Sequence, residues 1–114
     1  MFGLFDGDAI VGLAGVIMDW NDPRAATAVL VASYLLPGYR RRGLSVRFYE
    51  ARLAWVQAQP GVTRVVVSHR ASNDASRRAI QRHGFCETAR TSRQWHDGIT
   101  EDEVVYELPI ERGT

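Results

Sequence analysis

The chain has 114 residues, of which 46% are apolar, enough for one compact domain with a single core. Its net charge of +1 gives no reason to expect a nucleic-acid partner, and no apolar run approaches the roughly 18 residues of a membrane span. Cys86 is the only cysteine, which excludes an internal disulfide and fits a cytoplasmic protein. Every basic residue is arginine, so a Schiff-base mechanism using a lysine of this chain is also excluded.

The first half of the chain predicts three strands and a helix. Apolar runs indicate strands at 2–5, 9–20 and 27–36, and the Asp6-Gly7-Asp8 turn joins the first two as a hairpin. The third run is nearly continuous, as expected for a strand covered on both faces. Helical spacing follows at 45–59. The predicted buried stripe of this helix consists of Leu44, Phe48, Ala51, Trp55 and Ala58.

The second half predicts a further strand, a helix and a final hairpin. The strand covers 64–68, the helix covers 74–83, and the hairpin strands cover 86–95 and 103–110. Asn73 is a suitable cap for the start of this helix. Ala75, Ala79 and Ile80 are expected to face inward, and Arg78 and Arg82 outward. Helices therefore connect strands in the middle of the chain while hairpins flank them, which predicts a mixed sheet with helices packed on it.

The arginines gather in two clusters, which favour a polyanionic ligand, although a solvated arginine-rich surface fits the composition equally well. The clusters are Arg40, Arg41, Arg42 and Arg47, and Arg70, Arg77, Arg78 and Arg82. Three members of the first cluster, Arg40 to Arg42, lie in the segment Leu35–Ser45, where a buried strand passes through a glycine-containing turn into a helix. Unpaired N–H groups and the helix dipole attract phosphate there, and Gly43 lets the backbone approach a bulky anion.

Two motifs resemble the GNAT superfamily of acetyltransferases. Arg40, Gly43 and Ser45 follow its Arg/Gln-x-x-Gly-x-Gly/Ala signature, except that serine replaces the final small residue. The segment from Asn73 to Phe85 resembles Asn-x-x-Ser/Ala followed by Gly-Phe, in the style of the branch that acetylates the N-terminal alanine or serine of ribosomal proteins. Both motifs fall in the family's order and on the family's elements.

The resemblance implies a single GNAT-like domain over residues 1–114. Its class would be α/β (α+β), with a mixed, mostly antiparallel sheet and a central strand–helix–strand–helix core that binds acetyl-CoA. The reaction implied is direct attack of a primary amine, from a protein N-terminus or a small molecule, on the thioester, with no metal. The cofactor-binding residues implied are Leu35, Leu36, Pro37, Arg40, Arg41, Arg42, Gly43, Leu44, Ser45, Asn73 and Ser76.

The acid–base pair best known in the family is missing. Many relatives place a tyrosine at the position of Ile80 and a glutamate at that of Ser68, and neither residue here can replace them. Ser76 is therefore the predicted catalytic residue, as proton donor to the leaving thiolate, from a helical face shared with Asn73 and Ile80. The alternative is an ordinary serine that satisfies a backbone group in the first helical turn.

Other candidate residues favour structural roles. His69 could act as a base, but its strand is apolar on the same face, which favours a structural histidine. Cys86 is expected to be buried filler rather than an acyl carrier. The acidic segment 97–103 either attracts a cationic amine or is a solvated turn. No metal-ligand spacing is present.

Members of the family usually begin with a strand and two helices before the first hairpin, whereas Met1 of this sequence already lies in the predicted hairpin. Either the true start lies upstream or the form is minimal, which would leave an open edge that a homodimer would cover. The main alternative to an active enzyme is a catalytically silent acyl-CoA-binding or regulatory module. An RNA-binding domain using Tyr39 and the adjacent arginines lacks interleaved aromatic residues and a basic face.

Overall fold

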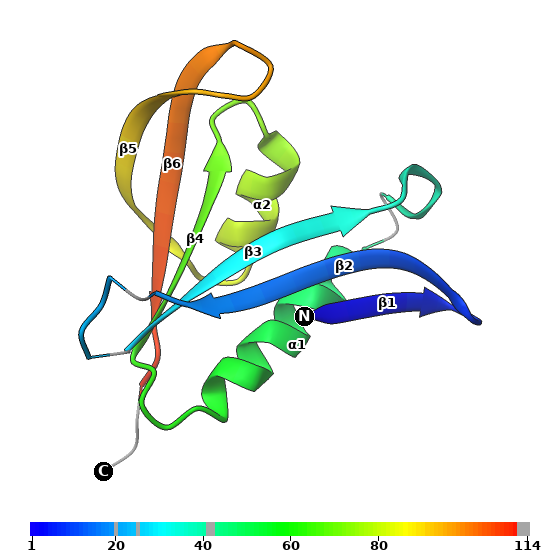
Figure 1. The fold of residues 1–114 in the computed structure, drawn as a ribbon, viewed down its shortest axis with the longest axis horizontal. Coiled ribbons are helices and arrows are strands. Elements are labelled where there is room, and N and C mark those ends of the chain that lie inside the picture. Colours follow the sequence, from blue (N-terminus) through cyan, green and yellow to red (C-terminus); the bar gives the residue numbers. More distant parts are fainter. Residues whose placement is uncertain (20, 25, 41–42, 112–114) are drawn as a thin grey trace.

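One six-stranded sheet carries two helices on one of its faces in the computed structural model, which describes residues 1–19, 21–24, 26–40 and 43–111 without the side chains of 32 and 33 (Figure 1). The strands are β1 Phe2–Asp6, β2 Ala9–Met18, β3 Thr27–Leu35, β4 Arg64–Arg70, β5 Cys86–Gln94 and β6 Thr100–Pro109. The helices are α1 Ser45–Gln57 and α2 Asp74–Arg82, and a 3-10 turn covers Pro37–Tyr39. The predicted order of elements is confirmed.

The sheet order is β1-β2-β3-β4-β6-β5, and only the β3–β4 pair is parallel among the described strands. This confirms the mixed, mostly antiparallel sheet. The parallel pairing is short, because it covers only the three pairs from Thr27–Arg64 to Val29–Val66. Beyond them β3 and β4 diverge, and Figure 1 shows the two strand ends pointing in different directions.

A bulge in β3 accompanies this divergence. Gly15 pairs with Val31 and Leu13 with Tyr34, so two steps along β2 correspond to three along β3. Such an extra residue bends its strand and increases the local twist. The bulge therefore turns the end of β3 away from β4, toward the start of α1.

The core lies between the helices and the sheet. It joins residues of every layer: Ala28 and Leu30 from β3, Val56 from α1, Val65 and Val67 from β4, Ile80 from α2, and Val104 and Tyr106 from β6. Val29 and Val31 are half-buried, so β3 is well covered on one face only, and the predicted cover on both faces is wrong.

The buried stripe predicted for the first helix is also wrong in part. The buried residues of α1 are Phe48, Tyr49, Arg52 and Val56, whereas Trp55 and Ala58 are exposed. The helix is thus rotated by about one residue from the expected orientation. The error arose because an arginine was not a candidate for the inner face, yet Arg52 is fully buried.

The two strands of the β5–β6 hairpin differ, because β6 supplies Val104 and Tyr106 to the core and β5 supplies no buried residue. Every residue of β5 is exposed, which explains its poor alternation and corrects the prediction that Cys86 is buried. Arg70 at the end of β4 binds the hairpin through Asp97 at 2.7 Å and Glu101 at 2.5 Å. Its guanidinium holds the pKa of both carboxyls below their ordinary values. This part of the acidic segment therefore has a structural partner.

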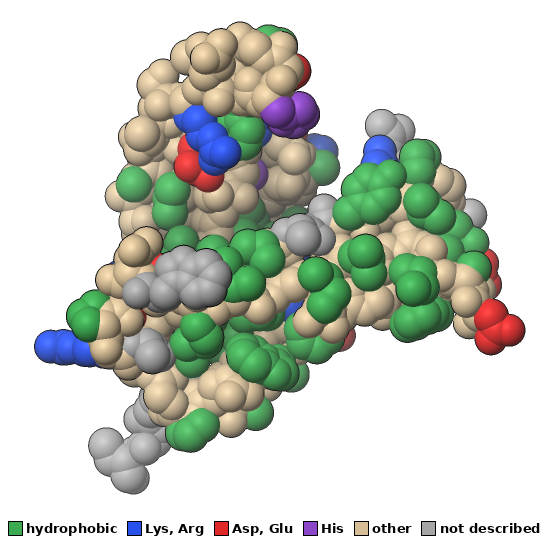
Figure 2. Space-filling model, viewed as in Figure 1, with side chains coloured by type: hydrophobic (Ala, Val, Ile, Leu, Met, Phe, Trp, Pro, Cys, Tyr) green, Lys and Arg blue, Asp and Glu red, His purple; other side chains and the backbone are tan. Residues whose placement is uncertain are grey.

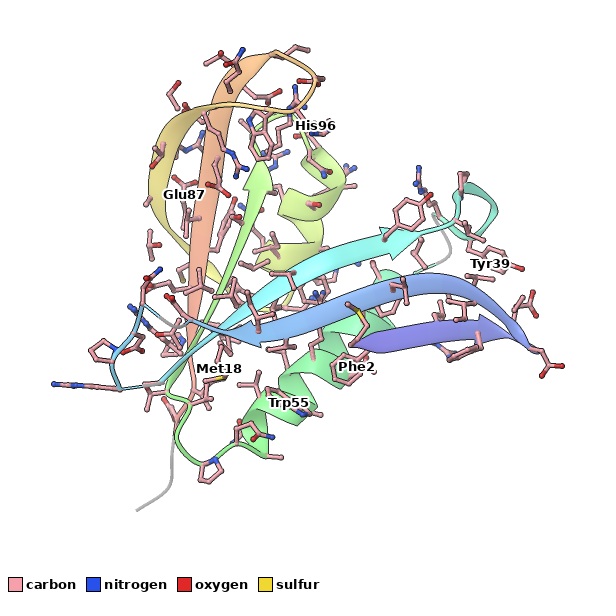
Figure 3. The ribbon with its side chains drawn as sticks, in the orientation of Figure 1. Phe2, Met18, Tyr39, Trp55, Glu87 and His96 are labelled. Carbon is pink, nitrogen blue, oxygen red and sulfur yellow. The ribbon has the colours of Figure 1, made fainter. Side chains whose placement is uncertain are left out.

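The 3-10 turn, which sequence patterns missed, lies against the first hairpin. The Tyr39 hydroxyl donates to an Asp6 carboxylate oxygen at 2.6 Å. Figure 3 shows Tyr39 beside the end of the β1–β2 hairpin. The loop that follows β3 is therefore tied at its start to the sheet edge.

Gly12 is required where β2, β3 and α1 meet. A Cβ at this position would lie 2.7 Å from a methyl of Leu35, 2.9 Å from the Phe48 ring and 3.0 Å from the Tyr34 carbonyl oxygen. We predict that Gly12→Ala lowers the free energy of unfolding by about 1–3 kcal/mol, the usual cost of overpacking. Urea denaturation measures this change in the free energy of unfolding. Gly61→Ala is the matched control, since nothing lies within 4 Å of its Cβ; equal stability of the two variants would contradict the prediction.

Candidate functional site

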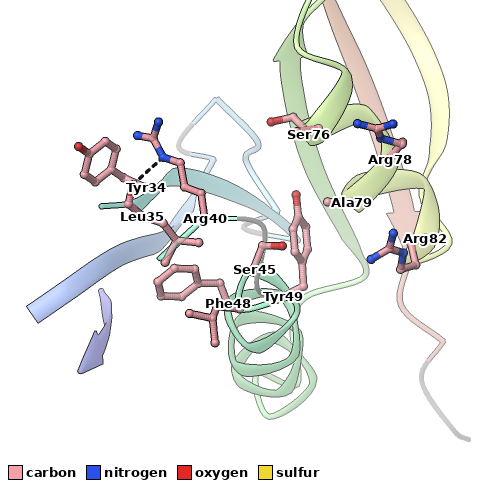
Figure 4. A pocket seen from close by; sticks show the side chains of 13 residues that line it. Tyr34, Leu35, Arg40, Ser45, Phe48, Tyr49, Ser76, Arg78, Ala79 and Arg82 are labelled. Atoms are coloured by element: carbon pink, nitrogen blue, oxygen red, sulfur yellow. Dashed lines mark hydrogen bonds between the residues drawn. The ribbon is translucent and has the colours of Figure 1, made fainter. Parts of the chain in front are cut away.

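A cavity of about 560 Å³ opens where β3 leaves β4. Its walls are the end of β3 with the following loop, the first turns of α1, and one face of α2 (Figure 4). The lining residues are Tyr34, Leu35, Arg40, Gly43, Leu44, Ser45, Phe48, Tyr49, Ala75, Ser76, Arg78, Ala79 and Arg82. The two sequence motifs, which β4 separates in the chain, therefore form opposite walls of one cavity.

The cavity contains most of the predicted cofactor residues. Those that line it are Leu35, Arg40, Gly43, Leu44, Ser45 and Ser76. Leu36, Pro37 and Asn73 do not line it, and Arg41 and Arg42 lie outside the described residues. Asn73 instead caps α2, because its side-chain oxygen accepts the Ser76 N–H at 3.1 Å. The predicted cap is therefore confirmed.

The two helices differ at their N-termini in a way that bears on ligand binding. Asn73 and the adjacent Asp74 supply α2 with a side-chain cap and an acidic first turn. The N-cap position of α1 is Leu44, and no described side chain caps this helix or places an acid in its first turn. The Arg47 N–H donates to the Leu44 carbonyl at 3.0 Å, but the N–H groups of Ser45 and Val46 have no acceptor among the described residues. These groups and the partial positive charge of the helix end lie beside the cavity that Leu44 and Ser45 line.

Gly43 precedes this open helix end in a left-handed conformation, with a φ of 73°. Residues with a Cβ rarely adopt this conformation, so glycine lets the chain turn from the loop into the helix. No described residue beyond its chain neighbours lies within 4 Å of the position that a Cβ would occupy. The turn thus leaves open space directly beside the uncapped N–H groups, as an anion site requires.

Side chains and turn bonds fix the loop between β3 and Gly43. The Arg40 side-chain Nε donates to the Leu35 carbonyl at 2.9 Å, and its guanidinium lies over the Tyr34 ring, 5.4 Å from the centroid. The Leu36 and Pro37 carbonyls accept the N–H groups of Tyr39 and Arg40. The carbonyls of 35, 36 and 37 therefore have partners within the chain before any ligand is considered.

The cavity is electrostatically positive. Three arginines line it, namely Arg40, Arg78 and Arg82, and no described lining residue is acidic. Acidic side chains within reach of arginines occur elsewhere, as at the Arg70 contacts with the hairpin. The lining therefore favours an anionic ligand over a cationic one.

Tyr49 forms the floor of the cavity and connects the two helices. Its ring stacks on His83, with centroids 4.5 Å apart and an interplanar angle of 18°, and meets Phe85 edge-on. Burial raises the pKa of the Tyr49 phenol, with a partly offsetting effect of the nearby Arg52 guanidinium. The phenol therefore stays protonated at neutral pH. Tyr49 is not predicted from the sequence, because the expected buried stripe of the helix does not include position 49.

The buried Arg52 packs against Tyr49 and does not itself line the cavity. Its Nε donates to the Phe48 carbonyl at 3.2 Å, and Nη1 lies 3.4 Å from the Val31 carbonyl, just beyond the last β3–β4 pair. The guanidinium lies over the Tyr49 ring at 4.8 Å. Its Nη2 has no hydrogen-bond partner among the described residues, and burial lowers the pKa of the group.

Among the residues considered for a catalytic role from the sequence, namely Ser76, His69 and Cys86, Ser76 alone lines the cavity, and Figure 4 shows it on the α2 wall. No described group forms a hydrogen bond with its hydroxyl, whereas its backbone N–H is held by the Asn73 cap. Ile80, one helical turn after Ser76, is 1% exposed and belongs to the core, whereas Ser76 lines the cavity. The inner face of α2 divides between the core and the cavity.

His69 is a structural residue, as predicted. It is buried, its Nε2 lies 3.1 Å from the Tyr106 hydroxyl and its Nδ1 lies 2.7 Å from the Arg70 carbonyl oxygen. Ser68, at the position where many relatives carry glutamate, donates its hydroxyl to Glu103 at 2.8 Å. A carboxylate from β6 therefore lies beside that position on the sheet.

The described residues contain no group of three or more histidine, cysteine or acidic side chains that could hold a metal ion. None of the described helices is long and apolar enough to cross a membrane.

Comparison with solved structures shows that the fold is shared with several acetyltransferases. A GNAT-family acetyltransferase from Streptococcus pneumoniae superposes with a TM-score of 0.83 at 20% identity, over 93% of this chain and 64% of that one. The ribosomal-protein-S18-alanine N-acetyltransferase from Escherichia coli gives 0.81 at 23% identity, over 98% and 69%. A Salmonella typhimurium protein solved with its cofactor acetyl-CoA gives 0.79 at 21% identity, over 96% and 64%.

These likenesses show a shared fold, and this chain spans roughly two thirds of the length of those structures. A search of curated proteins finds no match to the sequence. The model of the acetyltransferase (GNAT) family matches residues 1–85, which include β1 to β4, the first helix, the turn at Gly43 and all of α2. The chain therefore belongs to the acetyltransferase (GNAT) family.

Proposed function

We propose that the chain transfers an acetyl group from acetyl-CoA to a primary amine, on a protein N-terminus or a small molecule. The observation that carries the proposal is the uncapped start of α1 behind Gly43, which faces an arginine-lined cavity without described acidic residues. Family membership and the neighbour solved with acetyl-CoA support the choice of cofactor.

The residues present fit such a cofactor. The N–H groups at the start of α1 and the open space beside Gly43 suit its pyrophosphate, and Arg40 adds positive charge from the loop. The diverging strands leave an opening for the pantetheine arm next to Leu35. When bound, acetyl-CoA supplies an activated thioester that an uncharged amine can attack.

Catalysis would then require few groups of this chain. The cavity would hold the two reactants close together in a reactive orientation, which by itself accounts for much of the rate acceleration. The hydroxyl of Ser76 can donate a hydrogen bond to the departing sulfur from the α2 wall, and the Tyr49 phenol offers a second protonated hydroxyl on the floor. No other acid is needed, since a CoA thiolate is a fairly stable leaving group.

The alternative is a catalytically silent acyl-CoA-binding module. The observation that favours it is Ile80, an apolar core residue at the position where many relatives carry a catalytic tyrosine. Thiol release from acetyl-CoA, measured against a panel of amines and peptides, separates the two. CoA binding without thiol release on any amine would favour the silent module.

Cofactor binding can be tested at Gly43. We predict that Gly43→Glu abolishes CoA binding in calorimetry. The introduced carboxylate would occupy the phosphate site and repel the phosphate, and the left-handed backbone at this position would be strained by a Cβ. Gly98→Glu is the matched control, since Gly98 also has a positive φ of 83° and open space, but lies in the β5–β6 turn. Tight CoA binding by the Gly43→Glu variant would show that this loop does not bind the cofactor.

The role of Ser76 can be tested by turnover. If its hydroxyl acts at the sulfur, Ser76→Ala should lower kcat about 100-fold, the lower end for a positioned proton donor. The CoA dissociation constant should stay the same, because no phosphate contact is lost. Arg77→Ala provides the control, as Arg77 lies on the same helix, pairs with Asp74 at 3.2 Å and does not line the cavity. Normal turnover would return Ser76 to a structural role, and loss of CoA affinity would mark it as a positioning residue.

We also propose that two copies associate through the β1–β2 region. β1 pairs only with β2 and ends the sheet, and Leu13 and Ile17 of β2 are 42% and 44% exposed. Figure 2 shows apolar side chains gathered over this face. An edge strand of one copy can pair with the same edge of another about a two-fold axis.

Sedimentation velocity at micromolar concentration tests this association. We expect a dimer for the wild type and a monomer for Ile17→Glu, because the introduced charge would be buried in the interface. Ile99→Glu should stay dimeric, since Ile99 is exposed in the distant β5–β6 turn. A wild-type monomer would contradict the proposal.

The cytoplasmic location stays a prediction, which fractionation of cells would test.

A further inference from the structure

The second arginine cluster divides into two pairs with different surroundings. Arg70 binds Asp97 and Glu101, and Arg77 pairs with Asp74 within α2. Arg78 and Arg82 form no ion pair with any described residue, although both are charged and exposed. The first pair has a structural explanation within the fold, and the second has none.

Arg78 and Arg82 share one face of α2. They are four residues apart, so their side chains project from successive turns of the same side, and the small Ala75 and Ala79 lie beside them. All four residues line the cavity. Figure 4 shows both guanidinium groups on the α2 wall, across the cavity from Arg40. Two like charges at this spacing repel each other, so an anion bound between them would stabilise both.

This anion site is distinct from the one at the start of α1. The Gly43 turn and the uncapped helix end form one wall, whereas Arg78 and Arg82 stand on the other. The lining therefore has two separate regions of positive charge. A ligand that satisfies both must carry two anionic groups at some distance from each other.

CoA has this distribution of charge, with a pyrophosphate and a separate phosphate on the 3′ position of its ribose. We propose that Arg78 and Arg82 bind the 3′-phosphate and make the cavity selective for CoA over 3′-dephospho-CoA. The inference rests on the proposed function, because it assumes that the pyrophosphate occupies the Gly43 end. Fork-shaped guanidinium donors suit a phosphate dianion at an exposed site, where a single ion pair contributes little.

Isothermal titration of CoA and of 3′-dephospho-CoA provides the test. The proteins are the wild type, Arg78→Gln, Arg82→Gln, the double variant and Arg77→Gln as the matched control on the same helix. We expect the wild type to bind CoA roughly 10- to 100-fold more tightly than 3′-dephospho-CoA, as for one or two charge-assisted contacts at an exposed site. The preference should weaken as salt is added.

The double variant should bind the two ligands equally, while its affinity for 3′-dephospho-CoA stays at the wild-type value. That unchanged affinity also shows that the variant is folded. Arg77→Gln should keep the full preference. Equal binding of the two ligands by the wild type would overturn the inference while leaving the proposed function intact. A loss of affinity for both ligands alike in the double variant would also overturn it, because the arginines would then serve another part of the ligand. Failure of the wild type to bind either ligand would overturn the proposed function itself.

Discussion

The divergence of β3 from β4 is the constraint on which the rest of the structure depends. After three parallel pairs the strands separate, and backbone groups that a continuing sheet would pair must find other partners. The buried Arg52 approaches one of them, the Val31 carbonyl, from below. The same divergence places the end of β3, the start of α1 and one face of α2 around a shared space. The cavity is thus a consequence of strand geometry, and the side chains decide what it can bind.

The contrast between the two helix ends shows how the chain separates stability from binding. Asn73 satisfies the start of α2 with its own side chain, a cap of the kind that contributes about 1 kcal/mol to stability. The start of α1 has no described side-chain cap, so the chain forgoes that stabilisation at the position where Gly43 opens the backbone to the cavity. An anion bound there would act as the missing cap. Binding and helix stability are therefore linked at this end of α1.

Much of this arrangement could be predicted from the sequence, because hairpin turns, β-branched runs and helix caps act locally. The order of strands and helices, the Asn73 cap and the loop at Gly43 are examples. The floor of the cavity could not be predicted. Placing Tyr49 inside requires knowing that the charged Arg52 is buried beside it, and helical periodicity treats arginine as a surface residue. Likewise, Cys86 is exposed because β5 is the edge strand of the sheet and buries none of its residues. The apolar pattern of the sequence does not reveal this.

The arginines illustrate why residue type alone does not identify a site. Arg70 and Arg82 belong to the same cluster in sequence, yet the first lies between two carboxylates and the second lines a cavity without described acidic residues. A paired arginine has its field largely cancelled by its partners, whereas an unpaired one retains it toward the solvent. The charges of Arg40, Arg78 and Arg82 therefore remain directed toward the cavity, and only an anionic occupant would neutralise them there.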